Sequence, residues 1–275
     1  MSQGADIAHV FCTAGAGPII KSYSPELIVH PYLLELSRPD KSKQESVTSE
    51  IRKWLDKFDV LVVGPGLGRN DFLHDCVDVI LTDARERDIP IIVDADGLYN
   101  LTRKPSVTLQ GYLRATITPN VAEFKRLMAM YGQDYNQNDE MKPGDDAVAL
   151  SCKMGGVTVV QKGPKDICAF EKGFDVCDEP GSLRRCGGQG DVLSGLIAVF
   201  TNWAYMAHET DPTTPGLPQL NGAFAGCFIT RLTARRTFQH VGRSMGVPDM
   251  IEMLPRVLLD TFPTKYGMLD DDDDT

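Results

Sequence analysis

Short runs of apolar, β-branched residues alternate with helix-period segments along most of the chain. Runs that are apolar on both faces are typical of parallel strands covered by helices on two sides. The predicted strands are His9–Cys12, Leu27–Val29, Val60–Val63, Ile91–Val93, Ala115–Ile117 and Val157–Gln161. The predicted helices are Asp71–Arg87, Val121–Met130, Asp145–Met154, Val192–Ala207, Ala223–Phe238 and Asp249–Leu259. The alternation predicts an α/β fold, with a mainly parallel sheet flanked by helices on both faces.

Two further β-rich runs, Ile167–Phe170 and Phe174–Cys177, surround Lys172-Gly173 and predict a hairpin at one edge of the sheet. The chain turns helical after them, so we expect the sheet to end there. Polar composition predicts loops at Ser37–Glu50, Gln133–Gly144 and Glu209–Pro218.

None of these loops is long enough, or distinct enough in composition, to mark a domain boundary. We therefore expect residues 1–265 to form a single domain. Residues 266–275 contain five consecutive aspartates. Like charges at this density repel, which predicts a solvated, disordered tail.

Composition excludes several classes of protein. A net charge of −10 argues against nucleic-acid binding, which requires a basic face. The seven cysteines are scattered without a Cys-x-x-Cys pair, which indicates free thiols in a reducing compartment, and the five histidines show no metal-ligand spacing. We therefore expect no metal held by direct protein ligation. No apolar run approaches the roughly 20 residues of a membrane span, and no targeting signal is visible. A cytoplasmic protein is expected.

Two glycine-containing motifs follow predicted strands. Gly64–Gly68 reads GPGLG, and its spacing does not match the dinucleotide fingerprint G-x-G-x-x-G. By itself it indicates either tight strand–helix packing or a ligand loop. The next motif, VDADGL, places Asp94 and Asp96 at a strand end. These carboxylates suit either Mg²⁺ held through water or a helix cap, with Asp94 the better functional candidate.

Two more motifs end strands further along the chain. In Thr118–Phe124, TPNVAEF, the residues Asn120 and Glu123 can cap a helix or form a polar rim facing a small molecule. In QKGPKD, Lys162 beside a glycine suits a nucleotide phosphate, and a charged turn is the alternative. Ligands of open parallel sheets bind at this carboxyl edge.

The segment Arg184–Asp191, RRCGGQGD, is the most informative. Its three glycines precede a predicted helix, where bare backbone N–H groups and the helix dipole form an anion site. Asp191 is placed as a general base for a hydroxyl that attacks a phosphoryl group. The alternative is an acidic residue that stabilises its own helix. The chain has no Walker A motif, so an ATP site here belongs to another class.

Taken in order, GPGLG, VDADGL, TPN-x-x-EF, KG-x-x-D and CGGQGDVLSGLIAV resemble the ATP-dependent NAD(P)H-hydrate dehydratase family, in particular its eukaryotic members. The phrase YSPELIVHP adds to the resemblance, which runs from about Ala5 to Met250. It implies a ribokinase-like fold and the ATP-dependent dehydration of (S)-hydrated NADH or NADPH, with ATP and Mg²⁺ required. Phosphorylation of the ring hydroxyl and phosphate elimination would restore the reduced cofactor.

The resemblance also implies site residues, with Asp191 as the catalytic base. Substrate contacts would come from Gly68, Asn120, Val121, Ala122, Glu123, Phe124, Lys125, Arg126 and Asp191. ATP contacts would come from Lys162, Gly163, Pro164, Lys165, Asp166, Ser182, Leu183, Arg184, Arg185, Cys186, Gly187, Gly188, Gln189 and Gly190. Mg²⁺ would arrive with ATP, and a contact from Asp94 through water is the functional alternative that the VDADGL motif leaves open.

The chain departs from the family pattern at two places. Val121 stands where family members usually carry His, so a histidine that could contact the substrate is absent. Family members also begin with a further strand and glycine-containing turn upstream of ADIAHVFC. We therefore expect the first βα unit to be missing here. The exposed sheet edge would then cause poor solubility or a homo-oligomer. A mitochondrial form would require a longer N-terminus.

Two other functions remain open from the sequence. Another ribokinase-like enzyme would phosphorylate a small molecule and release the product, sharing Asp191 and its glycine-rich loop but not the GPGLG and TPN-x-x-EF pair. A non-catalytic nucleotide-binding protein would hold ATP through Lys162 and Gly187–Gly190 without turning it over.

Overall fold

Six strands form one sheet in sequence order. The computed structural model describes residues 4–103, 109–133, 135 and 144–263. The sheet consists of β3 (Leu61–Val63), β4 (Ile91–Val93), β5 (Ala115–Ile117), β6 (Thr158–Gln161), β7 (Asp166–Phe170) and β8 (Gly173–Cys177). The first four are parallel, and β7 and β8 add an antiparallel hairpin at the edge. The predicted hairpin is confirmed.

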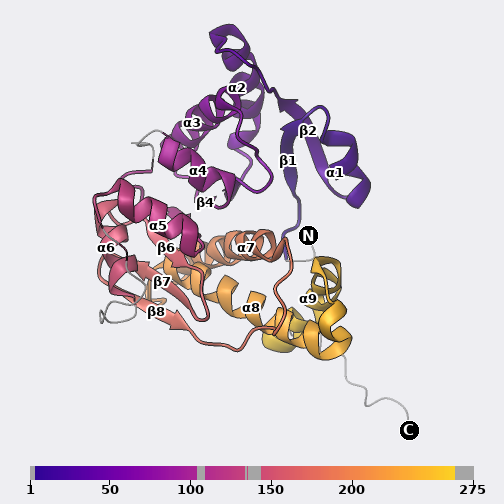
Figure 1. The fold of residues 1–275 in the computed structure, drawn as a ribbon, viewed down its shortest axis with the longest axis vertical. Coiled ribbons are helices and arrows are strands. Elements are labelled where there is room, and N and C mark those ends of the chain that lie inside the picture. Colours follow the sequence, from indigo (N-terminus) through magenta and orange to yellow (C-terminus); the bar gives the residue numbers. More distant parts are fainter. Residues whose placement is uncertain (1–3, 104–108, 134, 136–143, 264–275) are drawn as a thin grey trace.

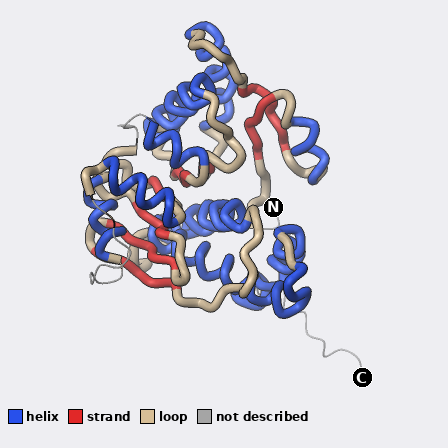
Figure 2. Tube along the Cα trace, in the orientation of Figure 1, coloured by secondary structure: helices blue, strands red, loops and turns tan. Residues whose placement is uncertain are grey.

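Helices cover both faces of this sheet. In β4, Ile91 and Val93 belong to a core shared with helices α2 to α6, whereas Ile92 between them packs on the opposite side with α7 and α8. In the shared orientation of Figure 1 and Figure 2, α6 lies to the left of β6–β8, and α7 and α8 lie to their right. The elements on the first side are α2 (Lys41–Leu55), α3 (Asp71–Glu86), α4 (Asp96–Arg103), α5 (Val121–Met130) and α6 (Asp145–Lys153). The alternation of buried side chains explains why the strands are apolar on both faces.

Helices α7 (Gln189–Thr210) and α8 (Pro218–Val241) pack unusually close together. A Cβ atom at Gly222 would lie 2.5 Å from Thr201 Cα, and one at Gly226 would lie 2.8 Å from the backbone nitrogen of Ile197. Glycine on one helix therefore lets the two backbones touch. The short helix η1 (Gly242–Ser244) follows, and α9 (Val247–Thr261) packs against the pair through a third apolar cluster.

The N-terminal unit forms a second, smaller sheet. Strands β1 (His9–Thr13) and β2 (Ile28–Leu33) pair in parallel, and α1 (Gly17–Tyr23) connects them along the chain. Within the described residues these strands pair with each other and not with the six-stranded sheet. In Figure 1 they project as a separate arm beside α2. Stacked and tilted rings join this arm to α2, among them His9, His30 and Trp54.

One predicted loop is wrong. Most of Ser37–Glu50 lies in α2, which begins after Asp40, whose side chain accepts a hydrogen bond from the Lys43 backbone. The helix forms because Val47, Ile51 and Leu55 recur every four residues and are buried. The prediction was wrong because the first turns of this helix are polar, so that the composition of the segment resembled a loop.

Other boundaries shift by a few residues. Helix α7 starts three residues before the predicted Val192, and α8 starts at Pro218, a favoured first residue of a helix. The predicted loop Glu209–Pro218 does join these two helices, although its ends belong to them. Most of Gln133–Gly144 and the whole acidic stretch 266–275 lie outside the described residues. Within the described part, no helix has the length and apolar character needed to cross a membrane.

Candidate active site

Four of the motifs lie side by side at the carboxyl edge of the parallel strands. The backbone N–H of Asp94, after β4, donates to the Val63 carbonyl at the end of β3, with N and O 3.0 Å apart. The backbone N–H of Lys162, after β6, donates to the Pro119 carbonyl that follows β5 at 2.9 Å. The sheet therefore gathers segments that are far apart in the sequence, as expected for a ligand site of this fold.

The first glycine of GPGLG serves packing. Gly64 has a φ of +123°, and a Cβ atom there would lie 1.8 Å from the Asp94 carbonyl oxygen. Only glycine fits this contact, because both the backbone angle and the space exclude a side chain. The loop after β3 is thereby held directly against the loop after β4.

An ion pair joins two of the motifs at the centre of the edge. Lys162 Nζ lies 2.8 Å from Asp94 Oδ1, and the Asp94 side chain is only 3% exposed. Gly190 adjoins both groups, since a Cβ there would lie 3.4 Å from Asp94 Oδ2 and 3.7 Å from Lys162 Nζ. Asp94, Lys162 and the glycine-rich loop thus converge, although they lie on three separate segments.

Asp191 is the third residue of α7 and lies beside this pair. Partial removal from water raises the pKa of its carboxyl, the neighbouring Asp94 charge raises the pKa further, and Lys162 opposes both effects. The carboxyl nevertheless remains accessible to solvent. A carboxylate with a raised pKa is a stronger base, which suits proton abstraction.

Backbone donors surround the start of α7. Gly188 adopts a left-handed conformation, with φ +87°, and caps the helix. The first bond within the helix runs from the Val192 N–H to the Gly188 carbonyl. The N–H groups of residues 189–191 therefore precede the helical hydrogen-bond ladder and point toward the helix N-terminus, where an anion is stabilised.

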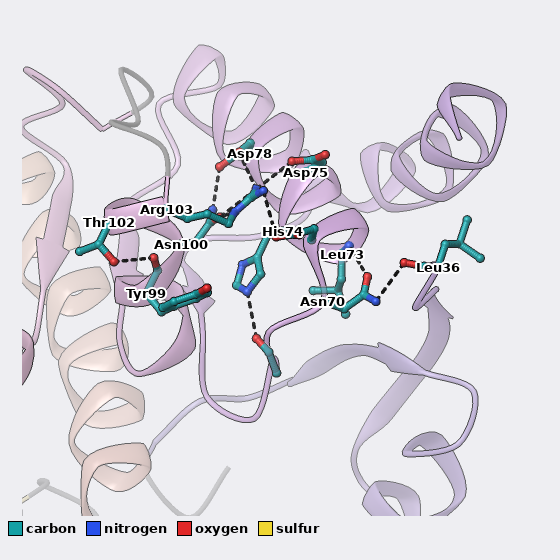
Figure 3. A network of polar contacts seen from close by, with 12 residues as sticks. Leu36, Asn70, Leu73, His74, Asp75, Asp78, Tyr99, Asn100, Thr102 and Arg103 are labelled. Atoms are coloured by element: carbon teal, nitrogen blue, oxygen red, sulfur yellow. Dashed lines mark hydrogen bonds and ion pairs between the residues drawn. The ribbon is translucent and has the colours of Figure 1, made fainter. Parts of the chain in front are cut away.

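Gly68, the predicted substrate contact in GPGLG, is held from both sides. Its N–H donates to Asp96 Oδ2 at 3.0 Å, and its carbonyl accepts from His74 Nε2 at 2.9 Å. His74 is fully buried on α3 (Figure 3). Arg69 also pairs with Asp96, with Nε and Oδ1 3.7 Å apart. Asp96 is therefore occupied in holding this turn.

A polar network fixes the two helices behind that turn. Arg103 of α4 pairs with Asp75 and Asp78 of α3 at 2.8 and 3.6 Å, and Asn100 donates to Asp78 at 2.7 Å (Figure 3). Asn70 caps α3 and donates to the Leu36 carbonyl at 3.1 Å. Helices α3 and α4 are thus tied together, and with them His74 and Asp96.

The motif TPNVAEF begins α5 with a capping box. Asn120 Oδ1 accepts from the Glu123 backbone at 3.0 Å, and Glu123 Oε2 accepts from the Asn120 backbone at 2.8 Å. Asn120 and Glu123 therefore have the helix-capping role that the sequence offered as one of two interpretations. Phe124 is buried in the main core, whereas the remaining predicted contacts of this helix are exposed: Val121, Ala122, Lys125 and Arg126.

The loop KGPKD is closed by its own aspartate and by a distant arginine. Asp166 Oδ1 accepts from the Gly163 backbone at 3.0 Å, and its Oδ2 lies 3.0 Å from Arg231 Nη1. Pro164 and Lys165 are exposed. The sequence did not identify Arg231, because it lies within α8 and no local motif marks it. It did not identify His74 within α3 for the same reason.

Hydrogen bonds to backbone carbonyls hold the segment before α7, both within the segment and to η1. Ser182 Oγ and the Gln189 side-chain amide both donate to the Arg184 carbonyl, while the Arg184 guanidinium donates to the Arg243 carbonyl. Leu183 is 82% exposed. Arg185 and Gly187 are also exposed, and Cys186 is half-buried.

Known proteins share both this fold and this sequence pattern. A ribokinase-like superfamily protein from Enterococcus faecalis superimposes with a TM-score of 0.69 at 16% identity, covering 94% of this chain and 78% of that one. A Streptococcus mutans protein described as hypothetical gives 0.67 at 16% identity, covering 93% and 82%. At these identities the likeness establishes the fold, which is the ribokinase-like fold expected from the sequence.

Sequence similarity is much stronger to one family. An ATP-dependent (S)-NAD(P)H-hydrate dehydratase of Ciona intestinalis is 42% identical, over 95% of this chain and 69% of its own length. The human protein of the same name is 43% identical, over 91% and 69%. The family model described as NAD(P)H-hydrate dehydratase matches residues 1–256. The chain belongs to the NAD(P)H-hydrate dehydratase family.

Proposed function

We propose that this chain uses ATP to dehydrate (S)-hydrated NADH and NADPH and so regenerates the working cofactors. The observation that carries the proposal is the position of Asp191. Its carboxyl, with a raised pKa, lies at the N-terminus of α7 beside the Asp94–Lys162 pair. A base next to an anion-binding helix end suits transfer of a phosphoryl group to a hydroxyl.

The proposed reaction has two stages, which are phosphorylation of the ring hydroxyl and elimination of phosphate. Asp191 accepts the proton of the ring hydroxyl while the hydroxyl oxygen attacks the γ-phosphorus of ATP, so that an O–P bond forms and ADP leaves. The ring C–O bond then breaks, phosphate departs with the electron pair, and the ring-nitrogen lone pair stabilises the cation. Loss of a proton from the neighbouring carbon restores the double bond. Phosphorylation is needed because hydroxide is a poor leaving group.

ATP is assigned to the two glycine-containing loops. The triphosphate would lie against the backbone of Gly187–Gly190, with Lys162 as a local cation. Residues 163–166 and 182–186 would border the rest of the nucleotide. The hydrated ring would meet Gly68 and the exposed start of α5, where Val121 replaces the family His.

Mg²⁺ is assigned to the triphosphate. Asp94 Oδ1 is occupied by Lys162 and by the Ala95 backbone, whereas Oδ2 faces Gly190. A single carboxylate oxygen turned toward the phosphate site suits a water-mediated contact, which Mg²⁺ commonly uses in nucleotide sites. The ion would supply charge neutralisation of the phosphates.

Seven free thiols suit a reducing compartment, and we assign the chain to the cytoplasm. Self-association is assigned to the N-terminal arm, where Ile7, Ile19, Tyr23 and Ile28 are exposed apolar residues. Light scattering coupled to size exclusion tests this, and a monomer across micromolar concentrations contradicts it.

The deciding experiment follows absorbance at the NADH band after hydrated NADH, Mg²⁺ and ATP are added. ATP-dependent recovery, lost in Asp191→Asn, supports the dehydratase. A phosphorylated product released without recovery supports a small-molecule kinase instead. ATP binding without any turnover supports a non-catalytic protein.

A further inference from the structure

A single arginine of α8 contacts one segment assigned to ATP and the residue just upstream of the other. Arg231 Nε donates to the Glu179 carbonyl at 2.6 Å, just before the segment 182–190. Its Nη1 lies 3.0 Å from Asp166 Oδ2 and 3.4 Å from the Gly163 carbonyl, and its Nη2 donates to the Pro164 carbonyl. All three nitrogens of the guanidinium are therefore used on two loops.

These contacts are largely shielded from water. The Arg231 and Asp166 side chains are 15% and 9% exposed. Asp166 also accepts the Gly163 N–H, so its two oxygens join the loop backbone to the guanidinium. Arg235, one turn further along α8, pairs with Glu179 at 2.6 Å and supports the second loop alone.

The helix that carries Arg231 is itself fixed relative to Asp191. Gly222 and Gly226 bring α8 into backbone contact with α7, whose first turn holds the proposed base. A continuous series of contacts therefore runs from α7, which carries Asp191, across to α8 and through Arg231 to both loops. The nucleotide loops and the base share one support.

We propose that Arg231 is a positioning residue, which sets the separation of the loops 163–166 and 179–190 and thereby aligns ATP with Asp191. This inference rests on the proposed function for the identity of the nucleotide. Lysine cannot replace arginine here, because one ammonium cannot span the two loops as the planar fork does. Arg231 itself does not touch the reacting atoms.

The test compares Arg231→Lys and Arg231→Gln with Arg236→Lys as the matched control. Arg236 lies on the same helix but pairs with Asp260 of α9. Steady-state kinetics give KM for ATP and for hydrated NADH separately, and melting temperatures report folding. We expect KM for ATP to rise about tenfold or more in both Arg231 variants. KM for hydrated NADH stays within about twofold, and the Arg236 variant behaves as wild type.

A merely structural role predicts a different result. If Arg231→Lys melts at a lower temperature but keeps the KM for ATP of the wild type, or if both KM values rise together, the proposal is overturned. Titration with a non-hydrolysable ATP analogue, without hydrated NADH, measures the same effect as weaker binding. That titration still tests the role of Arg231 if the wild-type chain fails to dehydrate hydrated NADH. Failure of the proposed dehydratase function and failure of the positioning role are therefore distinguishable.

Discussion

Lys162 Nζ lies 2.8 Å from Asp94 Oδ1, and this pair joins the loop after β6 to the loop after β4. Asp94 is almost fully buried, whereas Lys162 retains partial exposure. Gly190 adjoins both groups. The pair thus contributes to the electrostatic environment of Asp191 and lies beside the glycine-rich loop that precedes this residue.

Asp191→Asn should abolish most of the turnover with little change in structure. Asparagine matches the shape of the carboxylate but cannot accept the proton, so kcat should fall by about 10²- to 10⁴-fold. Binding of an ATP analogue should stay within about threefold. Stopped-flow absorbance and calorimetric titration measure the two quantities. A variant with more than a tenth of the wild-type kcat would remove Asp191 from the role of base.

Asp94 and Lys162 should shift the pKa of Asp191 in opposite directions. Asp94 raises the pKa of Asp191 and Lys162 lowers it. Asp94→Asn should therefore lower the pKa of Asp191, and Lys162→Met should raise it. Carboxyl-carbon NMR titration of the nucleotide-free protein measures both shifts, and Lys165→Met is the control because Lys165 is exposed and pairs with Asp178. Shifts of the same sign in the two variants would contradict this electrostatic arrangement.

Two glycines of the same loop should differ sharply in tolerance. Gly64→Ala should cost more than about 4 kcal/mol of unfolding free energy, because the new Cβ collides with the Asp94 backbone. Gly66→Ala should cost only about 1 kcal/mol, since φ is +65° but open space surrounds the position. Urea unfolding compares them. Equal losses would show that backbone strain, not the close contact, selects glycine.

Mild acid should destabilise the fold through His74. Burial lowers the pKa of this imidazole below its ordinary 6.5. Below pH 6.5 the unfolded chain therefore binds a proton that the folded chain refuses. Stability present above pH 6.5 is lost as the pH falls toward the folded pKa, by up to about 1.4 kcal/mol per pH unit. His9 and His30, whose pKa values burial also lowers, add to the loss.

Urea unfolding at pH 7.5 and 5.5, with His74→Gln beside the wild type, measures this contribution. Glutamine retains an N–H that can donate to the Gly68 carbonyl but does not titrate, so the variant should lose less stability between the two pH values. An identical loss in both proteins would assign the acid sensitivity to other groups.

The sequence by itself determined the elements of the main sheet and the place of its motifs. Strands Ile91–Val93 and Ala115–Ile117, and helix Val121–Met130, were predicted with the bounds that the structure shows. These patterns are local: alternating burial, a capping residue and a glycine turn each act within a few residues. The family resemblance rested on the same short motifs.

Only the tertiary structure decided which motifs meet and what holds them. The contacts of Asp94 with Lys162 and of Asp166 with Arg231 join residues 68 and 65 positions apart. No local pattern encodes such pairs, because they depend on how strands and helices pack. Helix α2 was missed for a related reason, since its buried stripe gains stability from α3 and the core rather than from local propensity. Local chemistry specified the parts of this site, and packing over long sequence separations placed them together.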